Sequence, residues 1–385
     1  MTGPLAIAIL AHSTNPRGGV VHALELGDAL VRLGHRACVH APDAGGRGFF
    51  RETLCETRTI PAEALAGDTT ALVETRIADY LRHFADPTHR DFDVFHAQDG
   101  ISGNALATLK EQGLIRAFAR TVHHMDAFAD PRLALLQQRS IVNADALFVV
   151  SRTWQAHLAE TFERAAVRVG NGVDRMRFSP RPDGRDSALR QRLALGPGPI
   201  FLAVGGIEER KNTVRILEAF IQVRALLPTA QLIIAGGASL LDHNAYRRAF
   251  VHTLRTSALP SGAVIQTGPL AQADMPALYR VADALVFPSL KEGFGLVVLE
   301  AMASGLPVVA PAIAPFTEYL GPQDAAWCDP LTAHSIADAM MAVRTEPQRG
   351  RLVARGAEVA AAHDWQHTAR AHLAAYEQLT EPAHA

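Results

Sequence analysis

Short apolar segments alternate with amphipathic segments along the chain, and this alternation limits the fold more than any other feature. In the first half, apolar runs at residues 5–12, 36–42 and 144–151 are separated by segments with helical periodicity, such as residues 18–35. Buried strands that alternate with helices are typical of parallel sheets covered by helices on both faces. The first half therefore predicts a doubly wound, Rossmann-like α/β domain.

The same alternation begins again in the second half. Apolar runs at residues 199–207, 230–238 and 283–289 alternate with helical segments such as residues 213–228. Between the halves, residues 178–187 read FSPRPDGRDS, a composition rich in proline, glycine and charge that is typical of a linker. A chain of 385 residues is also too long for one ordinary core.

We therefore expect two Rossmann-like, doubly wound parallel-sheet domains that face each other across a cleft. Residues 1–178 would form the N-terminal domain and residues 186–363 the C-terminal domain. Ligands of such sheets bind beyond the carboxyl ends of the strands, so the cleft is the expected site.

Charge, cysteine usage and hydropathy exclude several function classes. A formal net charge of −2 gives no electrostatic argument for nucleic acid. The three cysteines, Cys38, Cys55 and Cys328, lie far apart without metal-like spacing and indicate a reducing compartment, so we expect a cytoplasmic protein. The apolar N-terminus lacks a basic leader and is interpreted as a buried strand, and no apolar stretch is long enough to span a membrane.

The segment from Lys291 to Ala310, KEGFGLVVLEAMASGLPVVA, joins a glycine-rich turn to an apolar helix. Because it follows an apolar strand, the turn and the helix N-terminus are expected to present backbone N–H groups to an anion such as phosphate. Glu300 in the helix can accept hydrogen bonds from the vicinal hydroxyls of a ribose, and Glu292 in the turn can do the same for a sugar ring. A structural alternative stays open, with Glu292 as a solvated turn residue and Glu300 as a charge favoured by the helix dipole.

Two adjacent cations occur in residues 204–212, VGGIEERKN, which connect a strand to a helix. Arg210 and Lys211 would stand at the start of that helix, where positive charge opposes the dipole. A diphosphate facing the two side chains would offset this cost. The alternative is that both are exposed charges in a loop.

The first half contains weaker candidates. Gly18 and Gly19 follow the first strand, where their amides could face a phosphate, although glycine pairs fill many tight turns. His123 follows a strand end and would point into the cleft, but most members of a set of 17 histidines are structural, and His96 has a weaker claim. Asn171 precedes a glycine and can simply hold that turn.

In this order, these motifs resemble the retaining glycosyltransferases of family 4, which have the GT-B fold. The resemblance covers essentially the whole chain. Its most specific part is the Glu-x7-Glu element of Glu292 and Glu300, and ADALFVVS, NGVDRMRF, TGPL and the terminal DW also fall at their expected places. The resemblance implies that the C-terminal helix, residues 364–385, packs back on the N-terminal domain.

The resemblance also implies a nucleotide-diphospho sugar as the donor, an acceptor hydroxyl, and transfer with retention at the anomeric carbon. Lys211 and Arg210 would neutralise the diphosphate, and Glu292 would touch the donor sugar. His123 would contact that sugar near the reacting carbon. The other donor-binding residues that we assign on this basis are Glu300 for the ribose, Gly18 and Gly19 for the phosphate, the amides of Phe294, Gly295 and Leu296 for the diphosphate, Gly268 and Leu270 near the base, and Asn171 and Gly206.

The chain departs from the family pattern at one position. An arginine usually follows the glycine of the VG strand end, where this chain has Gly206, so Arg210 is the candidate to supply the guanidinium by a different path. We expect no cofactor and no metal. An Asp-x-Asp element ends at Asp93, but it precedes an apolar strand, so Asp93 is interpreted as a strand-edge polar residue.

Other function classes stay open. A GT-B sugar-nucleotide epimerase or phosphorylase would share the fold, and a non-catalytic two-domain binding protein would share the bilobed form. The expected partners are a nucleotide sugar and an acceptor that is a small molecule, a glycan or a lipid-linked molecule, without nucleic acid. The sequence leaves open whether the protein contacts a membrane peripherally and what its oligomeric state is. It also leaves open the sugar and the choice among UDP, GDP and ADP.

Overall fold

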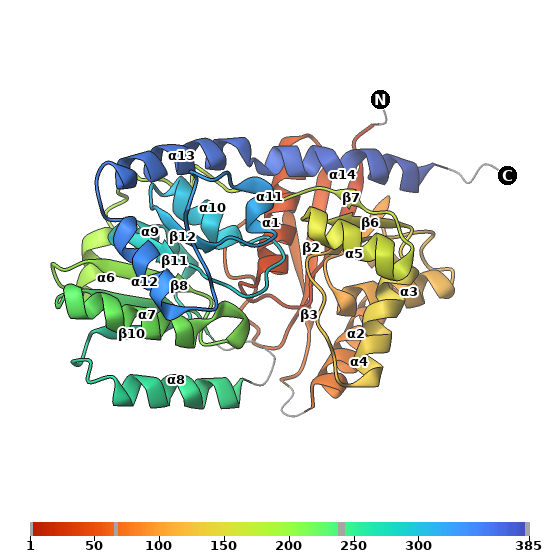
Figure 1. The fold of residues 1–385 in the computed structure, drawn as a ribbon. Helices are drawn as coiled ribbons and strands as arrows, with labels where there is room; N and C mark the ends of the chain where they lie inside the picture. Colours follow the sequence, from red (N-terminus) through yellow and green to blue (C-terminus); the bar gives the residue numbers. More distant parts are fainter. Residues whose placement is uncertain (1–2, 65–67, 238–242, 382–385) are drawn as a thin grey trace. The chain divides into compact units, whose positions relative to one another are not determined.

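The computed structural model describes residues 3–64, 68–237 and 243–381. The chain forms two compact units: unit 1 combines Met1–Gly172 with Trp365–Ala385, and unit 2 comprises Val173–Asp364. Each unit has a parallel sheet with helices packed on it (Figure 1). The expected fold class of two parallel-sheet α/β domains is confirmed.

The sheet of unit 1 has seven strands in the order β3-β2-β1-β4-β5-β6-β7, and all of its pairings are parallel. Its central strands β4 and β5 are buried along their whole length, and β1 and β2 at every residue but the first, as expected when helices cover both faces of a parallel sheet. The strands are β1 (Ala6–Leu10), β2 (Arg36–Asp43), β3 (Glu56–Pro61), β4 (Val94–Ala97), β5 (Ala119–Val122), β6 (Ala146–Val149) and β7 (Val167–Arg168).

Polar side chains cap the N-termini of several helices of unit 1. Asp99 accepts from the Ser102 amide in a capping box, and Asp130 and Ser151 cap the next two helices in the chain. The helices are α1 (Gly18–Arg32), α2 (Thr69–Ala85), α3 (Gly100–Glu111), α4 (Pro131–Val142), α5 (Arg152–Phe162) and α14 (Trp365–Thr380), with a 3₁₀ turn η1 (Pro87–His89).

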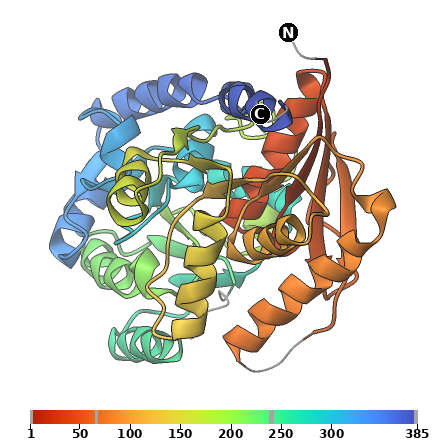
Figure 2. The same ribbon diagram turned by 90° about the vertical axis from the view of Figure 1, so that its right-hand side faces the viewer.

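The two faces of this sheet have different chemistry. Phe95 and Ala97 of β4 belong to the apolar core with residues of α2, α3 and α4. The intervening His96 points to the opposite face, where its ring contacts α14. Helix α14 packs beside α1, although most of the chain separates them (Figures 1 and 2). Residues 382–385 of the expected C-terminal helix lie outside the described residues.

The sheet of unit 2 has six parallel strands in the order β10-β9-β8-β11-β12-β13. The strands are β8 (Ile200–Val204), β9 (Gln231–Ala235), β10 (Val264–Gly268), β11 (Ala284–Val286), β12 (Val308–Pro311) and β13 (Ala326–Cys328). The expected strand at residues 230–238 thus corresponds to β9, and its last residue, Ala238, lies outside the described part.

The helices of unit 2 pack in two groups. Helix α7 contacts both α8 and α12 over the core that includes Phe201, Leu232 and Val286, while α9 and α13 both contact α10. The helices and 3₁₀ turns are α6 (Asp186–Arg192), η2 (Glu209–Lys211), α7 (Thr213–Leu226), α8 (Asn244–Thr256), η3 (Gln272–Asp274), α9 (Met275–Val281), α10 (Leu296–Ala303), α11 (Phe316–Tyr319), α12 (Ala333–Ala342) and α13 (Gln348–Ala362). In the described part of the chain, no helix has the length and apolarity needed to cross a bilayer.

Candidate functional site

The loop after β8 contains a backbone conformation that requires glycine. Gly206 has φ +78°, and a Cβ at this position would lie 2.5 Å from the carbonyl oxygen of Gly237 after β9. An arginine here, as in the family pattern, would therefore force the two loops apart. The departure noted in the sequence thus has a local structural cause.

The loop that carries the two predicted cations is tied to the loop after β11. The amide side chain of Asn212, which has φ +61°, donates to the carbonyl oxygens of Pro288 and Pro330. The Leu290 amide donates to the Arg210 carbonyl oxygen at 2.9 Å. These bonds bring η2 next to the turn that contains Glu292.

Arg210, Lys211 and Glu292 meet at this junction. The Oε1 atom of Glu292 accepts hydrogen bonds from Arg210 Nη1 and Lys211 Nζ, both at 2.7 Å, and Glu208 Oε2 lies 3.6 Å from Arg210 Nη2. Lys211 Nζ also lies 4.4 Å from the ring centroid of Phe287. The Glu292 and Lys211 side chains are only 8% and 14% exposed, whereas that of Arg210 is 37% exposed.

Burial and charge act in opposite directions on the pKa values of this cluster. Burial disfavours ionised Glu292, but the charges of Lys211 and Arg210 outweigh it and hold the pKa of Glu292 below its usual value. Burial lowers the pKa of Lys211, and the attraction of Glu292 only partly opposes that effect. The cluster is thus one buried cation, Lys211, and one partly exposed cation, Arg210, arranged around one acidic oxygen.

Glu300 lies on α10, in the same segment but with different partners. Its Oε2 accepts a hydrogen bond from the Tyr279 hydroxyl at 2.6 Å. Burial raises the pKa of Glu300, while the Tyr279 hydrogen bond and the charge of Arg177 act against that rise. Tyr279 was not identified from the sequence, because a tyrosine in an apolar helix is indistinguishable from an ordinary core residue.

The turn before α10 is rigidly packed. Gly295, at the helix N-cap, has φ +98°, and a Cβ there would lie 2.9 Å from the Phe316 ring. Phe294 is buried and stacks on Tyr319 with ring centroids 4.5 Å apart, and the Tyr319 hydroxyl donates to the Phe294 carbonyl oxygen. The first amides of α10, which begins at Leu296, lack partners within the helix and are available to an anion.

The predicted base-side residues lie near the ends of β9 and β10. The Gly236 amide donates to the carbonyl oxygen of Gly268, and a Cβ at Gly237 would contact the Pro269 ring. Leu270 is half-buried one residue later. Gly206 is on the loop after β8, whereas Gly268 ends β10 and Leu270 follows it, and β9 lies between these two strands in the sheet. Arg210, Lys211 and Glu292 are on loops that follow β8 and β11.

In unit 1, the structure brings Gly19 next to His123. A Cβ at Gly19 would lie 3.3 Å from His123 Cδ2, whereas a Cβ at Gly18 would meet nothing within 4 Å. His123 is half-buried, and its Nε2 lies 2.9 Å from the Gln98 side-chain oxygen, which can only accept. The Nε2 atom therefore carries the proton, and burial lowers the pKa of this imidazole.

Asn171 is held by a histidine that the sequence analysis did not assign. Its Oδ1 accepts from His22 Nδ1 at 2.6 Å, and the His22 ring lies 4.8 Å from that of His123, edge to face. Burial lowers the pKa of His22 to about 4, against the effect of the Asn171 hydrogen bond. Asn171 therefore supports the packing behind His123.

Two other polar residues from the sequence analysis are structural. His96 is buried between Thr121 Oγ1 at 2.8 Å and the Tyr376 hydroxyl at 2.7 Å, so it helps to hold α14 against the sheet. Asp93 Oδ2 accepts from the Ala6 amide at 2.7 Å, which agrees with its interpretation as a strand-edge residue. No group of three or more His, Cys, Asp or Glu side chains in the described residues is placed to hold a metal ion.

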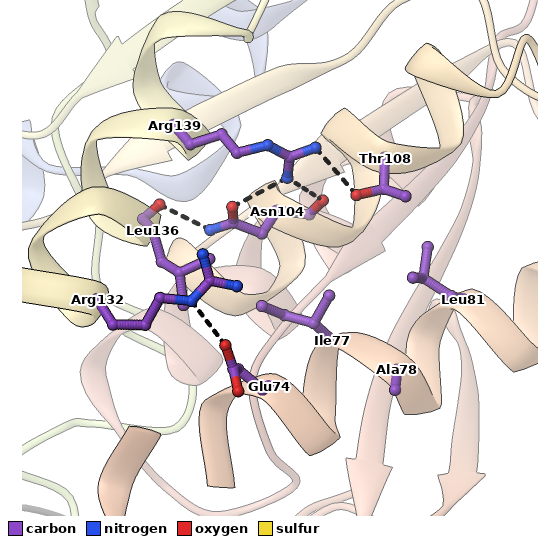
Figure 3. Close-up of a pocket in the computed structure, with 9 residues that line it drawn as sticks. All are labelled: Glu74, Ile77, Ala78, Leu81, Asn104, Thr108, Arg132, Leu136 and Arg139. Atoms are coloured by element: carbon purple, nitrogen blue, oxygen red, sulfur yellow. Dashed lines mark hydrogen bonds and ion pairs between the residues drawn. The ribbon is translucent and has the colours of Figure 1, made fainter. Parts of the chain in front are cut away.

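A groove of about 320 Å³ in unit 1 does not include any of these residues (Figure 3). It lies among α2, α3 and α4, with Ile77 and Leu81 on one side. Its arginines already have partners, since Arg132 Nε donates to Glu74 at 2.7 Å and Arg139 bonds to α3. The groove is therefore separate from the predicted donor-binding residues of unit 1.

Comparison with known proteins places the chain in a family. A model described as "Glycosyl transferases group 1" matches residues 186–359, and one described as "Glycosyl transferase 4-like domain" matches residues 17–172. The D-inositol 3-phosphate glycosyltransferase of Frankia alni is 30% identical over 333 residues, which are 80% of this chain and 79% of that enzyme.

Another relative matches a shorter stretch. The GDP-mannose-dependent alpha-(1-6)-phosphatidylinositol monomannoside mannosyltransferase of Mycolicibacterium smegmatis is 30% identical over 214 residues, so the match spans about half of either chain, 52% of this one and 53% of that one. A solved structure of Anabaena HepE in complex with UDP-glucose has a TM-score of 0.76 and 17% identity, over 97% of this chain and 100% of that chain. Together with the two parallel-sheet units, these matches show that the chain belongs to the group 1 glycosyltransferases of the GT-B fold.

Proposed function

We propose that this glycosyltransferase moves a sugar from a nucleotide-diphospho sugar to an acceptor hydroxyl, with retention and without a metal. The observation that carries the proposal is the convergence of Arg210 and Lys211 on one oxygen of Glu292. Two cations that already meet at one acidic atom are suited to hold a diphosphate, and they would stabilise the charge that develops on it as the sugar leaves.

The other groups of unit 2 complete a donor site in this proposal. The amides of Phe294, Gly295 and Leu296 add hydrogen-bond donors to the diphosphate at the start of α10. The diphosphate competes with Glu292 for the two cations, which frees that carboxylate to accept from a hydroxyl of the donor sugar. Glu300 accepts from the ribose.

Unit 1 contributes neutral groups. Because the Nε2 atom of His123 donates to Gln98, its Nδ1 atom is the one left to accept a hydrogen bond from the donor sugar. Gly19 packs against the His123 ring, so the Gly18–Gly19 amides and the imidazole act as one surface toward the donor.

The names of two similar proteins suggest donors to test, since one relative is GDP-mannose-dependent and one solved structure is a complex with UDP-glucose. Several relatives are D-inositol 3-phosphate glycosyltransferases, and this name suggests an acceptor. We therefore place GDP-mannose and UDP-glucose first in a panel of nucleotide sugars, and an inositol phosphate first among the acceptors.

The test is a product assay with this panel. We expect release of a nucleoside diphosphate together with a glycosylated product, and an unchanged rate in the presence of a metal chelator. The anomeric configuration of the product, measured by NMR from its one-bond C1–H1 coupling constant, should match that of the donor. An inverted product, or a rate that disappears with chelation, would contradict the corresponding part of the proposal. Nucleotide release without a glycosylated acceptor would favour an epimerase instead.

A further inference from the structure

The hydroxyl of Tyr279 makes its hydrogen bond to a carboxylate. Tyr279 lies on α9, its side chain is 0% exposed, and its hydroxyl donates to Glu300 Oε2 at 2.6 Å. A buried tyrosine hydroxyl needs a partner, but a neutral one would be enough. The partner is instead a charged group on the neighbouring helix α10, which indicates that the hydrogen bond also holds the carboxylate in place.

The two oxygens of Glu300 are in different states. Oε2 is bound by Tyr279, whereas Oε1 has no hydrogen-bond partner among the described residues. Oε1 is not buried, so solvent reaches it. The carboxylate is therefore anchored through one oxygen and presents the other to a ligand.

The surroundings of Glu300 also affect its ionisation. Burial raises its pKa, and the Tyr279 hydrogen bond and the charge of Arg177 are the effects that oppose the rise. The Arg177 guanidinium is itself fixed by the main chain and side chain of Gln272, at 3.0 and 2.8 Å. An ionised carboxylate offers only acceptors to the two hydroxyls of a vicinal diol, whereas a protonated one replaces part of that acceptor capacity with a donor.

We propose that Tyr279 is a positioning residue, which holds Glu300 so that its free oxygen selects ribonucleotides over 2′-deoxyribonucleotides. This inference rests on the proposed function, because it takes the nucleotide ribose as the ligand of Glu300. Tyr279 itself does not touch the ligand. It fixes one carboxylate oxygen, and the other oxygen then faces the 2′ and 3′ hydroxyls in a single orientation. Without the 2′ hydroxyl, one hydrogen bond to Glu300 is lost.

The test compares the binding of a nucleoside diphosphate with that of its 2′-deoxy form by calorimetry. The probe is whichever of UDP, GDP and ADP the full chain binds. We expect Glu300→Gln to weaken ribonucleotide binding on the order of 10- to 100-fold and Tyr279→Phe by about 3- to 10-fold, and both to reduce the ribose preference. The double variant should be no worse than Glu300→Gln alone, because Tyr279 acts through Glu300.

Two further measurements separate positioning from packing. Removing the Tyr279 hydroxyl removes an effect that lowers the Glu300 pKa, so binding by Tyr279→Phe should weaken more between pH 8 and pH 6 than binding by wild type. The matched control is Tyr376→Phe, which removes a buried hydroxyl that bonds to His96 in unit 1. Thermal unfolding of each variant reports any loss of the fold.

The outcomes distinguish this inference from the proposed function. If Glu300→Gln loses the ribose preference but Tyr279→Phe keeps the wild-type preference and pH profile, Tyr279 is a packing residue, and the proposed function stands. If Glu300→Gln keeps the full preference, the ribose assignment and this inference both fail. If the wild type binds none of the three nucleotides, the proposed function fails as well.

Discussion

The two units are built on the same kind of parallel sheet, yet they bury different polar groups near the carboxyl ends of their strands. Unit 1 gathers neutral rings, with His22 packed edge to face against His123, Trp365 and His372. Unit 2 gathers full charges, with Lys211 bound to Glu292. The same kind of parallel sheet can therefore be packed against neutral rings or lie beside a charged cluster, depending on a few side chains in the surrounding helices and loops.

The contrast has an energetic side. The Nε2 atoms of His22 and His372 are buried without a hydrogen-bond partner in the described part of the chain, so protonating either ring would bury an uncompensated charge. In unit 2 the buried charges of Lys211 and Glu292 are partners of each other. Acid should therefore affect unit 1 first, while loss of a charged side chain should damage the site of unit 2 most.

The largest expected effect is on turnover. Lys211→Met leaves Arg210 as the only cation bound to Glu292, and we expect kcat to fall on the order of 100- to 1000-fold, as for loss of one preorganised donor. The matched control is Lys110→Met, which removes an equal charge paired with Asp145 in unit 1. Steady-state kinetics with the active donor measure both. A Lys211→Met enzyme with wild-type kcat would show that the charged cluster of unit 2 is not needed for turnover.

The next effect concerns the pH dependence of the stability of unit 1. Burial lowers the pKa of His372 to about 3, from its usual value of 6.5. The unfolded chain therefore binds one more proton than the folded chain between these pH values, and stability is lost as the pH falls below 6.5. His372 alone should contribute up to about 1.4 kcal/mol of unfolding free energy per pH unit in this range.

The variant His372→Phe should lower that slope, which urea unfolding between pH 4.5 and pH 7 measures. Two of the three tryptophans, Trp154 and Trp365, lie in unit 1, so a Trp327→Phe background makes fluorescence specific to that unit. The control His334→Gln removes an exposed imidazole from unit 2. An unchanged slope in His372→Phe would show that the buried imidazole does not carry the acid sensitivity.

A smaller effect is expected in thiol labelling in acid, where the cysteines of the two units should become reactive one after the other. Burial raises the pKa of Cys38 and Cys55 in unit 1, and of Cys328 in unit 2, to about 12 in each case. All three should be inert in the native protein, because the thiolate is the reactive form. At pH 5, a pyridyl disulfide followed by peptide mass spectrometry should label the two unit 1 thiols before Cys328. Earlier labelling of Cys328 would reverse the predicted order.

The smallest effect is a matched pair of glycine substitutions. In Gly19→Ala the new Cβ lies 3.3 Å from the His123 ring, which must shift by a few tenths of an ångström, and we expect a few-fold increase in the donor KM. Gly18→Ala adds a Cβ that meets no protein atom within 4 Å, so His123 should not move. Kinetics together with the His123 imidazole NMR signals distinguish the two. Equal shifts in both variants would show that the contact at Gly19 is unimportant.

The fold was predictable where burial produces a pattern. Continuous apolar runs marked β1, β8 and β9, because strands buried on both faces contain few polar residues. Strand β3, ETRTIP, was not assigned, since it is an edge strand in which only Ile60 is buried and its composition matches that of a loop. Single-sequence periodicity has no signal for such a strand.

The candidate site was predictable only in part, for a similar reason. Adjacent charges such as Arg210 and Lys211 are visible because they interrupt an apolar pattern. Partners that lie in different elements, such as Tyr279 beside Glu300 or His22 beside His372, are brought together only by the packing of the fold. The left-handed conformation of Gly206, which explains the missing arginine, likewise depends on the approach of Gly237.

The position of α14 has a consequence for how the chain is made. Unit 1 needs α14 to cover the ring of Phe148 and the imidazoles beside it, yet α14 follows all of unit 2 in the chain. During synthesis, unit 2 is therefore complete on the ribosome while unit 1 still lacks its last helix. Part of the interior of unit 1 therefore stays open to water until unit 2 and α14 have been translated.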